Sequence, residues 1–219
     1  MPVILTQCGP MIAGMGLAVT VGNPCIGYDE EGEEHYRRQF AGLAAALAAE
    51  GHAWTPPDGA PPTGLARPYV GSFPYSCLHY LRRAYALHVE GQPVTPVVDG
   101  DLKDADGFVD DAASMLDSHL LCHSDCEGFY VPVPIADPVF LDEGPGGGMV
   151  GSSHGLLDEL RRVAPRISVR LDEDGSLSDA EADRLGAEGD PFETEQMVWL
   201  TLHEACRVSI ASGHPIVFH

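Results

Sequence analysis

Residues 192–219 read FETEQMVWLTLHEACRVSIASGHPIVFH, and this stretch contributes most to the interpretation of the fold. Phe192–Ala211 is mostly apolar and opens with Glu193 and Glu195, two acids that suit the positive end of a helix dipole. The pattern predicts a long helix that is buried on most of its sides. Pro215–Phe218 then predicts a short strand that closes a sheet edge.

Other predicted elements precede this stretch. Apolar residues at helical spacing or in short β-branched runs indicate them. The predicted helices are His35–Glu50, Tyr75–Val89, Asp110–Cys122 and one that Ser152 or Ser153 caps and that runs to Val163. The predicted strands are Val3–Thr6, Leu17–Val21, Phe129–Val133, Val139–Leu141 and Ile167–Leu171. Because helices and strands do not alternate strictly, we expect an α+β protein with several helices on a small mixed or antiparallel sheet.

The length and the loops favour one compact domain that spans residues 1–219. A domain of this size buries roughly 70% of the surface of its unfolded chain, so it needs no disulfide or metal to hold a core. Residues 51–74 contain six prolines and four glycines, which predicts a long loop. Phe129–Val133 is expected at a sheet edge, because Pro132 and Pro134 cannot donate to a central ladder.

The charge of the chain is strongly negative. Lysine and arginine number 12 against 33 acidic residues, which gives a formal charge of −21. Such a surface repels nucleic acids and anionic membranes, and it attracts basic proteins and speeds encounter with them. The acids of Asp29–Glu34 or of the Asp172–Asp174 turn are the expected contacts with a basic partner.

The first 27 residues carry no charge, but they do not read as a targeting segment. A signal peptide needs a basic start, and the first basic side chain is Arg37. Prolines and glycines cut the stretch into pieces much shorter than a membrane span of about 20 residues. Six scattered cysteines fit free thiols in a reducing compartment. We therefore expect a cytoplasmic protein.

Several catalytic patterns are incomplete in this sequence. Gly146–Gly155 matches a phosphate-binding loop except that Ser152 replaces its lysine, and it matches a nucleophile elbow around Ser153 except that Met149-Val150 is a short strand. Backbone amides at this helix start remain able to bind an anion. His203-Glu204 begins a zinc-protease motif that fails at Arg207. The sequence therefore favours a protein that is not an enzyme.

A second cluster has the residue types that zinc prefers. Its candidate ligands are His119, Cys122, His123 and Cys126. His119 and His123 are one helical turn apart, but adjacent Cys122 and His123 would point about 100° apart on a helix, so four ligands from one helix cannot converge. A zinc site here needs further ligands, such as His203 or His214.

The string His123-Ser124-Asp125-Cys126-Glu127-Gly128 resembles the His-Ser-Asp-Cys-Asp/Glu-Gly motif of a group of uncharacterised bacterial and phage-encoded proteins. The resemblance covers about ten residues, and no activity is attached to that group. It implies that Asp125, Glu127 and Gly128 act together as binding residues.

Two functions follow from these observations. The first is an acidic binding protein, of the immunity or inhibitor type, that covers a basic protein partner. The alternative is a small metal-dependent enzyme or metal-binding protein centred on His119–Cys126. The sequence leaves the oligomeric state open.

Overall fold

The computed structural model describes residues 16–65, 67, 71–98, 101–141, 148–187 and 189–219. In these residues the chain forms six α-helices, one 3₁₀ helix and six strands. The helices are α1 (Glu30–Ala49), α2 (Tyr75–Val89), α3 (Asp101–Ala113), α4 (Ser153–Val163), α5 (Asp179–Leu185) and α6 (Glu193–Ser212), with the 3₁₀ helix at Ala164–Ile167. The strands are β1 (Leu17–Val21), β2 (Ser72–Phe73), β3 (Gly128–Val131), β4 (Val139–Phe140), β5 (Met149–Ser152) and β6 (Ile216–Phe218).

The strands form one mixed sheet in the order β2-β1-β6-β3-β5-β4. Only β3 and β5 are parallel, and their register pairs Tyr130 with Gly151. The other neighbours run antiparallel. The C-terminal strand β6 lies between β1 and β3, so the last residues of the chain join the N-terminal strand to the rest of the sheet.

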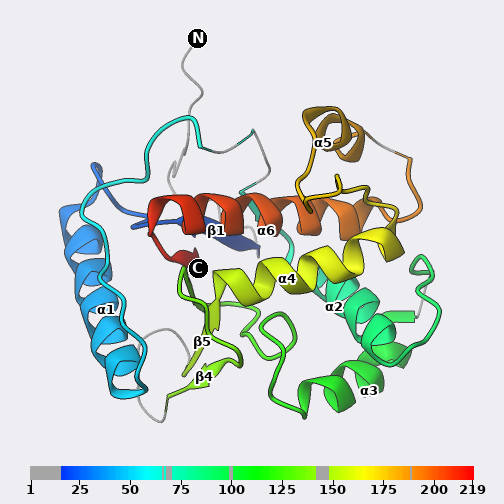
Figure 1. Cartoon of the computed structure of the whole chain (residues 1–219), viewed down its shortest axis with the longest axis horizontal. Helices are drawn as coiled ribbons and strands as arrows, with labels where there is room; N and C mark the ends of the chain where they lie inside the picture. The colour runs from blue at the N-terminus through cyan, green and yellow to red at the C-terminus, as the bar shows by residue number, and fades with distance from the viewer. Residues whose placement is uncertain (1–15, 66, 68–70, 99–100, 142–147, 188) are drawn as a thin grey trace.

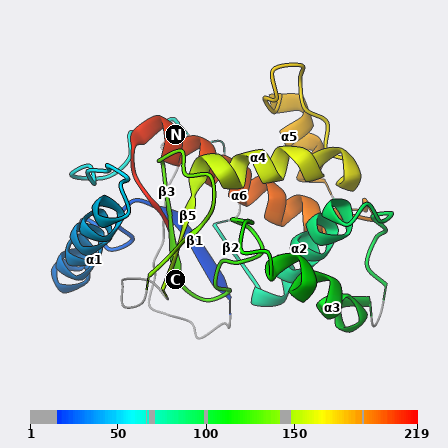
Figure 2. The same cartoon turned by 60° about the horizontal axis from the view of Figure 1, so that its bottom comes forward.

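Helices cover both faces of this sheet, as Figures 1 and 2 show, with α1 on one face and α2, α4 and α6 on the other. Successive side chains of β3 and β6 point to opposite faces of the sheet, so each strand contributes to the cores on both faces. Phe129 and Val217 join Phe40 and Leu43 of α1 in one core. Tyr130 and its neighbours on β6 join the larger core that α2, α4 and α6 complete. The chain is therefore an α+β protein, as the sequence predicted.

The long apolar stretch near the C-terminus forms the central helix of the larger core. Trp199 of α6 is wholly buried and donates from Nε1 to the carbonyl of Leu160 on α4, at 2.7 Å. Gln196 donates to the carbonyl of Ile167 at 2.9 Å. These two polar side chains thus find partners inside the protein.

Two predicted edge strands are central instead. Gly128–Val131 forms β3 between β6 and β5, and Pro132 and Pro134 follow its last residue, so they remove no ladder donor. The strand predicted at Pro215–Phe218 forms β6 as Ile216–Phe218, with a partner on either side. Both strands are buried throughout, as central strands covered on two faces are.

Three other predictions need correction. The helix expected at Asp110–Cys122 is α3 at Asp101–Ala113, so the acids of residues 101–106 begin it. The strand expected at Ile167–Leu171 does not form, because Ala164–Ile167 is a 3₁₀ helix and the amide of Arg170 donates to Glu181. Helix α1 begins at Glu30 rather than at His35, with the Asp29 side chain capping it.

The remaining expectations agree with the structure or lie outside it. Leu17–Val21 and Tyr75–Val89 have the predicted bounds, and Ser152 caps α4. The described residues of 51–71 hold neither helix nor strand, and β2 falls near the end of the predicted loop. The strand predicted at Val3–Thr6 lies outside the described residues. Among the helices that the structure describes, none combines the length and the apolar character needed to span a bilayer.

Close packing between β3 and β5 requires a glycine at position 151. A Cβ atom there would lie 2.3 Å from Cδ1 of Tyr130, whose ring is buried and whose hydroxyl donates to the carbonyl of His119 at 2.9 Å. We expect Gly151→Ala to lower the free energy of unfolding by about 2 kcal/mol in denaturant titrations, because neither the ring nor the strand has room to move.

Gly107→Ala is the matched control for this substitution. A Cβ at position 107 of α3 meets no atom within 4 Å, so alanine there should leave stability unchanged or raise it by about 0.5 kcal/mol. Equal effects of the two substitutions would contradict the packing argument.

Candidate protein-binding surface

Several of the few basic side chains form hydrogen bonds and ion pairs within the protein, and Arg82 is the clearest example. Its guanidinium lies on α2, is 5% exposed, and binds three groups of the loop that follows α3. Nε donates to the carbonyl of Leu120 at 2.9 Å, and the two terminal nitrogens bind the carbonyl of His123 and the carboxylate of Asp125. This loop has no regular structure, so the arginine supplies partners for backbone carbonyls that would otherwise be buried without them.

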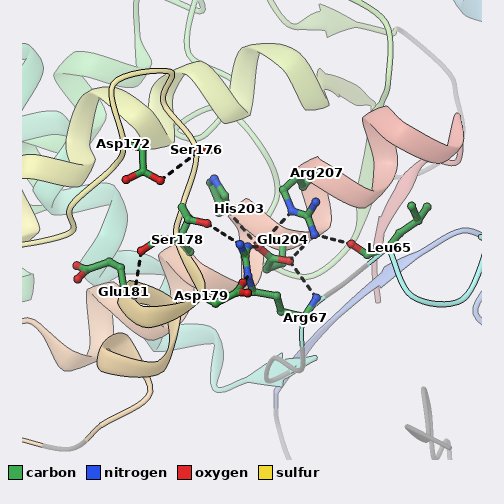
Figure 3. A network of polar contacts seen from close by, with 11 residues as sticks. Leu65, Arg67, Asp172, Ser176, Ser178, Asp179, Glu181, His203, Glu204 and Arg207 are labelled. Carbon is green, nitrogen blue, oxygen red and sulfur yellow. Dashed lines mark hydrogen bonds and ion pairs between the residues drawn. The ribbon is translucent and has the colours of Figure 1, made fainter.

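A second internal network centres on Glu204 of α6, and Figure 3 shows it from close by. The carboxylate is wholly buried. Oε1 lies 2.7 Å from Nη1 of Arg67, and Oε2 lies 3.1 Å from Nη2 of Arg207. Arg67 also reaches Asp179 of α5 at 2.7 Å, and Arg207 donates to the carbonyl of Leu65. The network ties the loop around residues 65–67 to α6 and α5.

The position of Glu204 changes its acidity. Burial alone would raise the pKa of this carboxyl, but the neighbouring His203 and Arg207 side chains and the hydrogen bond from the Arg67 amide outweigh burial and lower the pKa to about 2. Glu204 is therefore ionised at neutral pH, and its charge stabilises the fold.

The arginines that serve these networks leave many surface carboxylates without a basic neighbour. Among the described residues, the exposed acids that form no ion pair include Glu30, Glu31, Asp110, Asp111, Asp117, Glu173 and Asp183. They lie on or near α1, on α3 and the turn after it, and around α5, which are well separated in Figures 1 and 2. The surface is not uniform, because Arg162, Arg166 and Arg170 are exposed at the end of α4 and beyond it.

One of these acidic regions also exposes large apolar side chains. Phe108, Met115 and Leu116 are 45%, 72% and 54% exposed. They accompany the carboxylates of α3 and its following turn because Val109 and Ala112 occupy the inward side of the helix. We call this region the α3 surface, and it comprises Phe108, Asp110, Asp111, Met115, Leu116 and Asp117. Exposed apolar groups beside uncompensated charge are typical of a protein-binding site.

The residues predicted from the His-Ser-Asp-Cys-Glu-Gly string lie in the loop that Arg82 holds. Asp125 binds Arg82 and lies 3.1 Å from Nε2 of His79, so its carboxylate connects the loop to α2. Glu127 is exposed, and Gly128 begins β3 with a φ of 135°. Their joint role in binding remains a prediction.

The four candidate zinc ligands lie in the same loop but face different surroundings. His123 stacks on Tyr130 with 4.1 Å between ring centroids, and Cys122 contacts the carbonyl of Ala113. Cys126 is exposed. His119 packs against Gly155 of α4. Within the described part of the chain, no group of three or more histidine, cysteine, aspartate or glutamate side chains is arranged to hold a metal ion.

The glycine-rich segment also has a clear local structure near Ser153. Strand β5 does run directly into α4, although Met149-Val150 suggested a strand too short for that. Ser153 is nevertheless helical and wholly buried, and its hydroxyl lies 2.8 Å from that of Ser209. It does not adopt the positive φ of a strained turn. This serine therefore joins α4 to α6 and does not present a nucleophile.

Sequence reasoning missed the α3 surface because it placed the helix nine residues too late. The signal was available in Asp101, Asp104 and Asp106, which resemble the acidic run that opens α1. Acids in a first helical turn favour a helix start at 101. With that start, the spacing of Val109 and Ala112 already directs Asp110 and Asp111 outward.

The fold is that of an acidic α+β protein, and its α3 surface exposes carboxylates and large apolar side chains together. A family model described as "Putative DNA-mimic protein" matches residues 15–218, and the chain belongs to that family. No curated protein and no solved structure matches the chain.

The Glu204 network makes stability depend on pH in a defined direction. We expect Glu204→Gln to lower the free energy of unfolding by about 2 kcal/mol at pH 7, because it leaves Arg67 and Arg207 without their buried anion while both can still reach water. The folded pKa lies below the unfolded value of 4.5, so this stabilisation is complete above about pH 4.5 and is lost as the pH falls toward 2.

Denaturant titrations of both proteins at pH 7 and near pH 2.5 check this prediction, with Glu31→Gln as an exposed control. The difference between wild type and Glu204→Gln should shrink at the lower pH, whereas the control should match wild type at pH 7. A difference that is the same at both pH values would contradict the role assigned to the carboxylate.

Proposed function

We propose that this protein binds the DNA-binding surface of a basic protein and takes the place of DNA there. The observation that carries the proposal is the α3 surface, where three carboxylates without ion pairs lie beside three exposed apolar side chains. Membership of the family supports it. A DNA-binding protein presents lysine and arginine to phosphates, and a carboxylate accepts the same donors.

The acidic start of α1 offers a denser charge, but its own arginines reduce that charge. Five acids in the six residues Asp29–Glu34 span about 7.5 Å of helix, a length over which B-DNA carries about four or five charges. Arg37 pairs with Glu33 and Glu34, and Arg38 pairs with Glu34. Glu30 and Glu31 stay unpaired there, but the α3 surface combines three unpaired carboxylates with three exposed apolar side chains, so we assign the contact with the partner to α3.

The exposed apolar groups distinguish this surface from a merely soluble acidic face. Charge alone raises the rate of encounter and is screened by salt, whereas burial of Phe108, Met115 and Leu116 would slow dissociation. An inhibitor or immunity protein needs both properties, because it must compete with DNA and then remain bound. We therefore place the protein in this regulatory class.

Competition with DNA tests the proposal directly. Basic proteins captured from a cell lysate on the immobilised protein at low salt are challenged with a short DNA duplex or with polyglutamate at equal total charge. We expect the duplex to release the captured partner at much lower concentration than polyglutamate does. Equal release by the two polyanions would indicate general charge attraction, and no release by DNA would contradict the proposal.

Removal of three charges identifies the surface that is used. We expect the triple substitution Asp110→Asn, Asp111→Asn and Asp117→Asn to weaken binding of the captured partner about tenfold at low salt, and less at high salt, because each rim charge contributes on the order of 0.5 kcal/mol. The matched control combines Glu30→Gln, Glu31→Gln and Glu50→Gln. It removes the same charge from exposed positions of α1 and its C-terminal cap. Equal losses in both variants, measured by surface plasmon resonance, would contradict the assignment to α3.

A further inference from the structure

A cleft of about 460 Å³ lies between α2, α4 and the loop that follows α3, and it adjoins the α3 surface. Ala112 of α3 lines it, as does Asp117, which also belongs to the α3 surface. Val89 lines the cleft and is 54% exposed, so exposed apolar area reaches the opening. A protein bound to the α3 surface would therefore cover this opening and have room to place a side chain in it.

The walls of the cleft combine apolar side chains with a polar group that has no partner. Leu121 and Ile135 are buried there. Tyr85 of α2 is 3% exposed and lines the cleft, and its hydroxyl forms no hydrogen bond within the described part of the chain. Unlike Nε2 of His119, this oxygen is not enclosed by the protein, so a group in the cleft can reach it. Burial raises the pKa of the phenol, so the oxygen keeps its proton and can donate or accept.

Glu159 is a buried carboxyl group beside the cleft that has no basic partner. It is 3% exposed, and it accepts from the amides of His119 and Leu120 and from the hydroxyl of Ser118. No lysine or arginine of the described chain forms an ion pair with it, and burial raises its pKa to about 7. The carboxyl of Glu204, which has two arginine partners, has a pKa of about 2. Buried carboxylates are usually paired, so a cation placed in the cleft would stabilise the ionised form of Glu159.

The charges at the opening also favour a cation. Asp117 and Asp158 are exposed there, and Asp158 lies 3.4 Å from Arg161. Among the described residues Arg162 is the one arginine that lines the cleft, and the carboxylates that line it outnumber this arginine. A ligand that matches the walls has an apolar stem and a positively charged head with several donors. Among protein side chains, arginine has both.

We propose that this cleft receives an arginine side chain of the basic partner. The guanidinium donates to the carboxylate of Asp117 and to the hydroxyl of Tyr85, and the charge of Glu159 attracts it. The methylene stem lies against Leu121 and Ile135. The inference rests on the proposed function, because the α3 surface brings the partner to the opening. An arginine held in a pocket is typical of the few residues that contribute most of the affinity of an interface.

Nα-acetyl-arginine methylamide and its citrulline counterpart form a matched pair of probes, because citrulline replaces the guanidinium with a neutral urea of the same shape. Titration of the purified full chain, with tyrosine labelled at ¹³Cζ, is followed by NMR, and the signal that disappears in Tyr85→Phe is that of Tyr85. We expect the arginine probe to shift this signal in a saturable manner and the citrulline probe to bind at least tenfold more weakly. No saturable shift, or equal binding of the two probes, would overturn the proposal.

Asp117→Asn tests the carboxylate at the opening. We expect it to weaken binding of the arginine probe about threefold to fivefold, because it removes one charged acceptor at a partly exposed site. Asp183→Asn makes the same change at an exposed position of α5 that does not line the cleft, and it should leave binding of the probe unchanged. Equal affinities of the two variants would overturn the proposal.

Tyr85→Phe extends the test to the partner. It removes one oxygen, preserves the ring in the core and leaves the charge of the protein unchanged. We expect it to weaken binding of the captured partner about threefold to tenfold at low and at high salt, measured by surface plasmon resonance, the effect of one hydrogen bond. Thermal unfolding of the variant should match that of wild type.

Equal affinity of Tyr85→Phe and wild type for the partner would overturn the assignment of the arginine to this cleft. Release of the partner by DNA would then still support the proposed function. The titration with the arginine probe requires no partner and no DNA, so the failure of one proposal is distinguishable from the failure of the other.

Discussion

Scarcity of positive charge is the constraint on which the rest of this structure depends. Twelve basic side chains accompany 33 acidic ones, and several of the arginines hold loops to helices. Arg82 gathers the loop after α3, while Arg67 and Arg207 bind the buried carboxylate of Glu204. Arginine suits this work because its planar guanidinium donates in several directions at once. Each arginine used inside is unavailable to neutralise a surface acid.

Many acids are also engaged within the protein, so the local density of acidic residues alone does not identify the binding surface. In the Asp29–Glu34 run, Asp29 caps α1 and two glutamates pair with arginines of the same helix. Asp172 and Asp174 accept from Ser176 in their turn. Such acids shape the backbone near them and present less free charge than their number suggests. The α3 surface differs because three carboxylates without an ion pair in the described chain lie beside three exposed apolar side chains.

The sequence predicted the fold class and the elements with strong periodicity, but not their positions in the sheet. Leu17–Val21 and Tyr75–Val89 have the predicted bounds because apolar spacing alone determines them. Strand order depends on pairing between distant residues, and β6 joins β1 and β3 across nearly the whole chain. Local patterns carry no information on such pairing. The predicted strand Phe129–Val133 was assigned to an edge because of its prolines, and Pro215–Phe218 was also assigned to an edge. For the same reason, the sequence shows how many acidic residues the chain has, but not which of their carboxylates lack an ion pair in the folded protein.

His119 illustrates how one residue type supports different chemistry once its surroundings are known. In the sequence it stands four residues before His123, which suggests a pair of metal ligands. In the structure His123 stacks on Tyr130, whereas Nδ1 of His119 accepts from the amide of Ser152 and the Nε2 edge of its ring packs against Gly155. Rings fixed in this way serve packing and satisfy backbone groups, so the spacing of two histidines in a sequence does not by itself indicate a metal site.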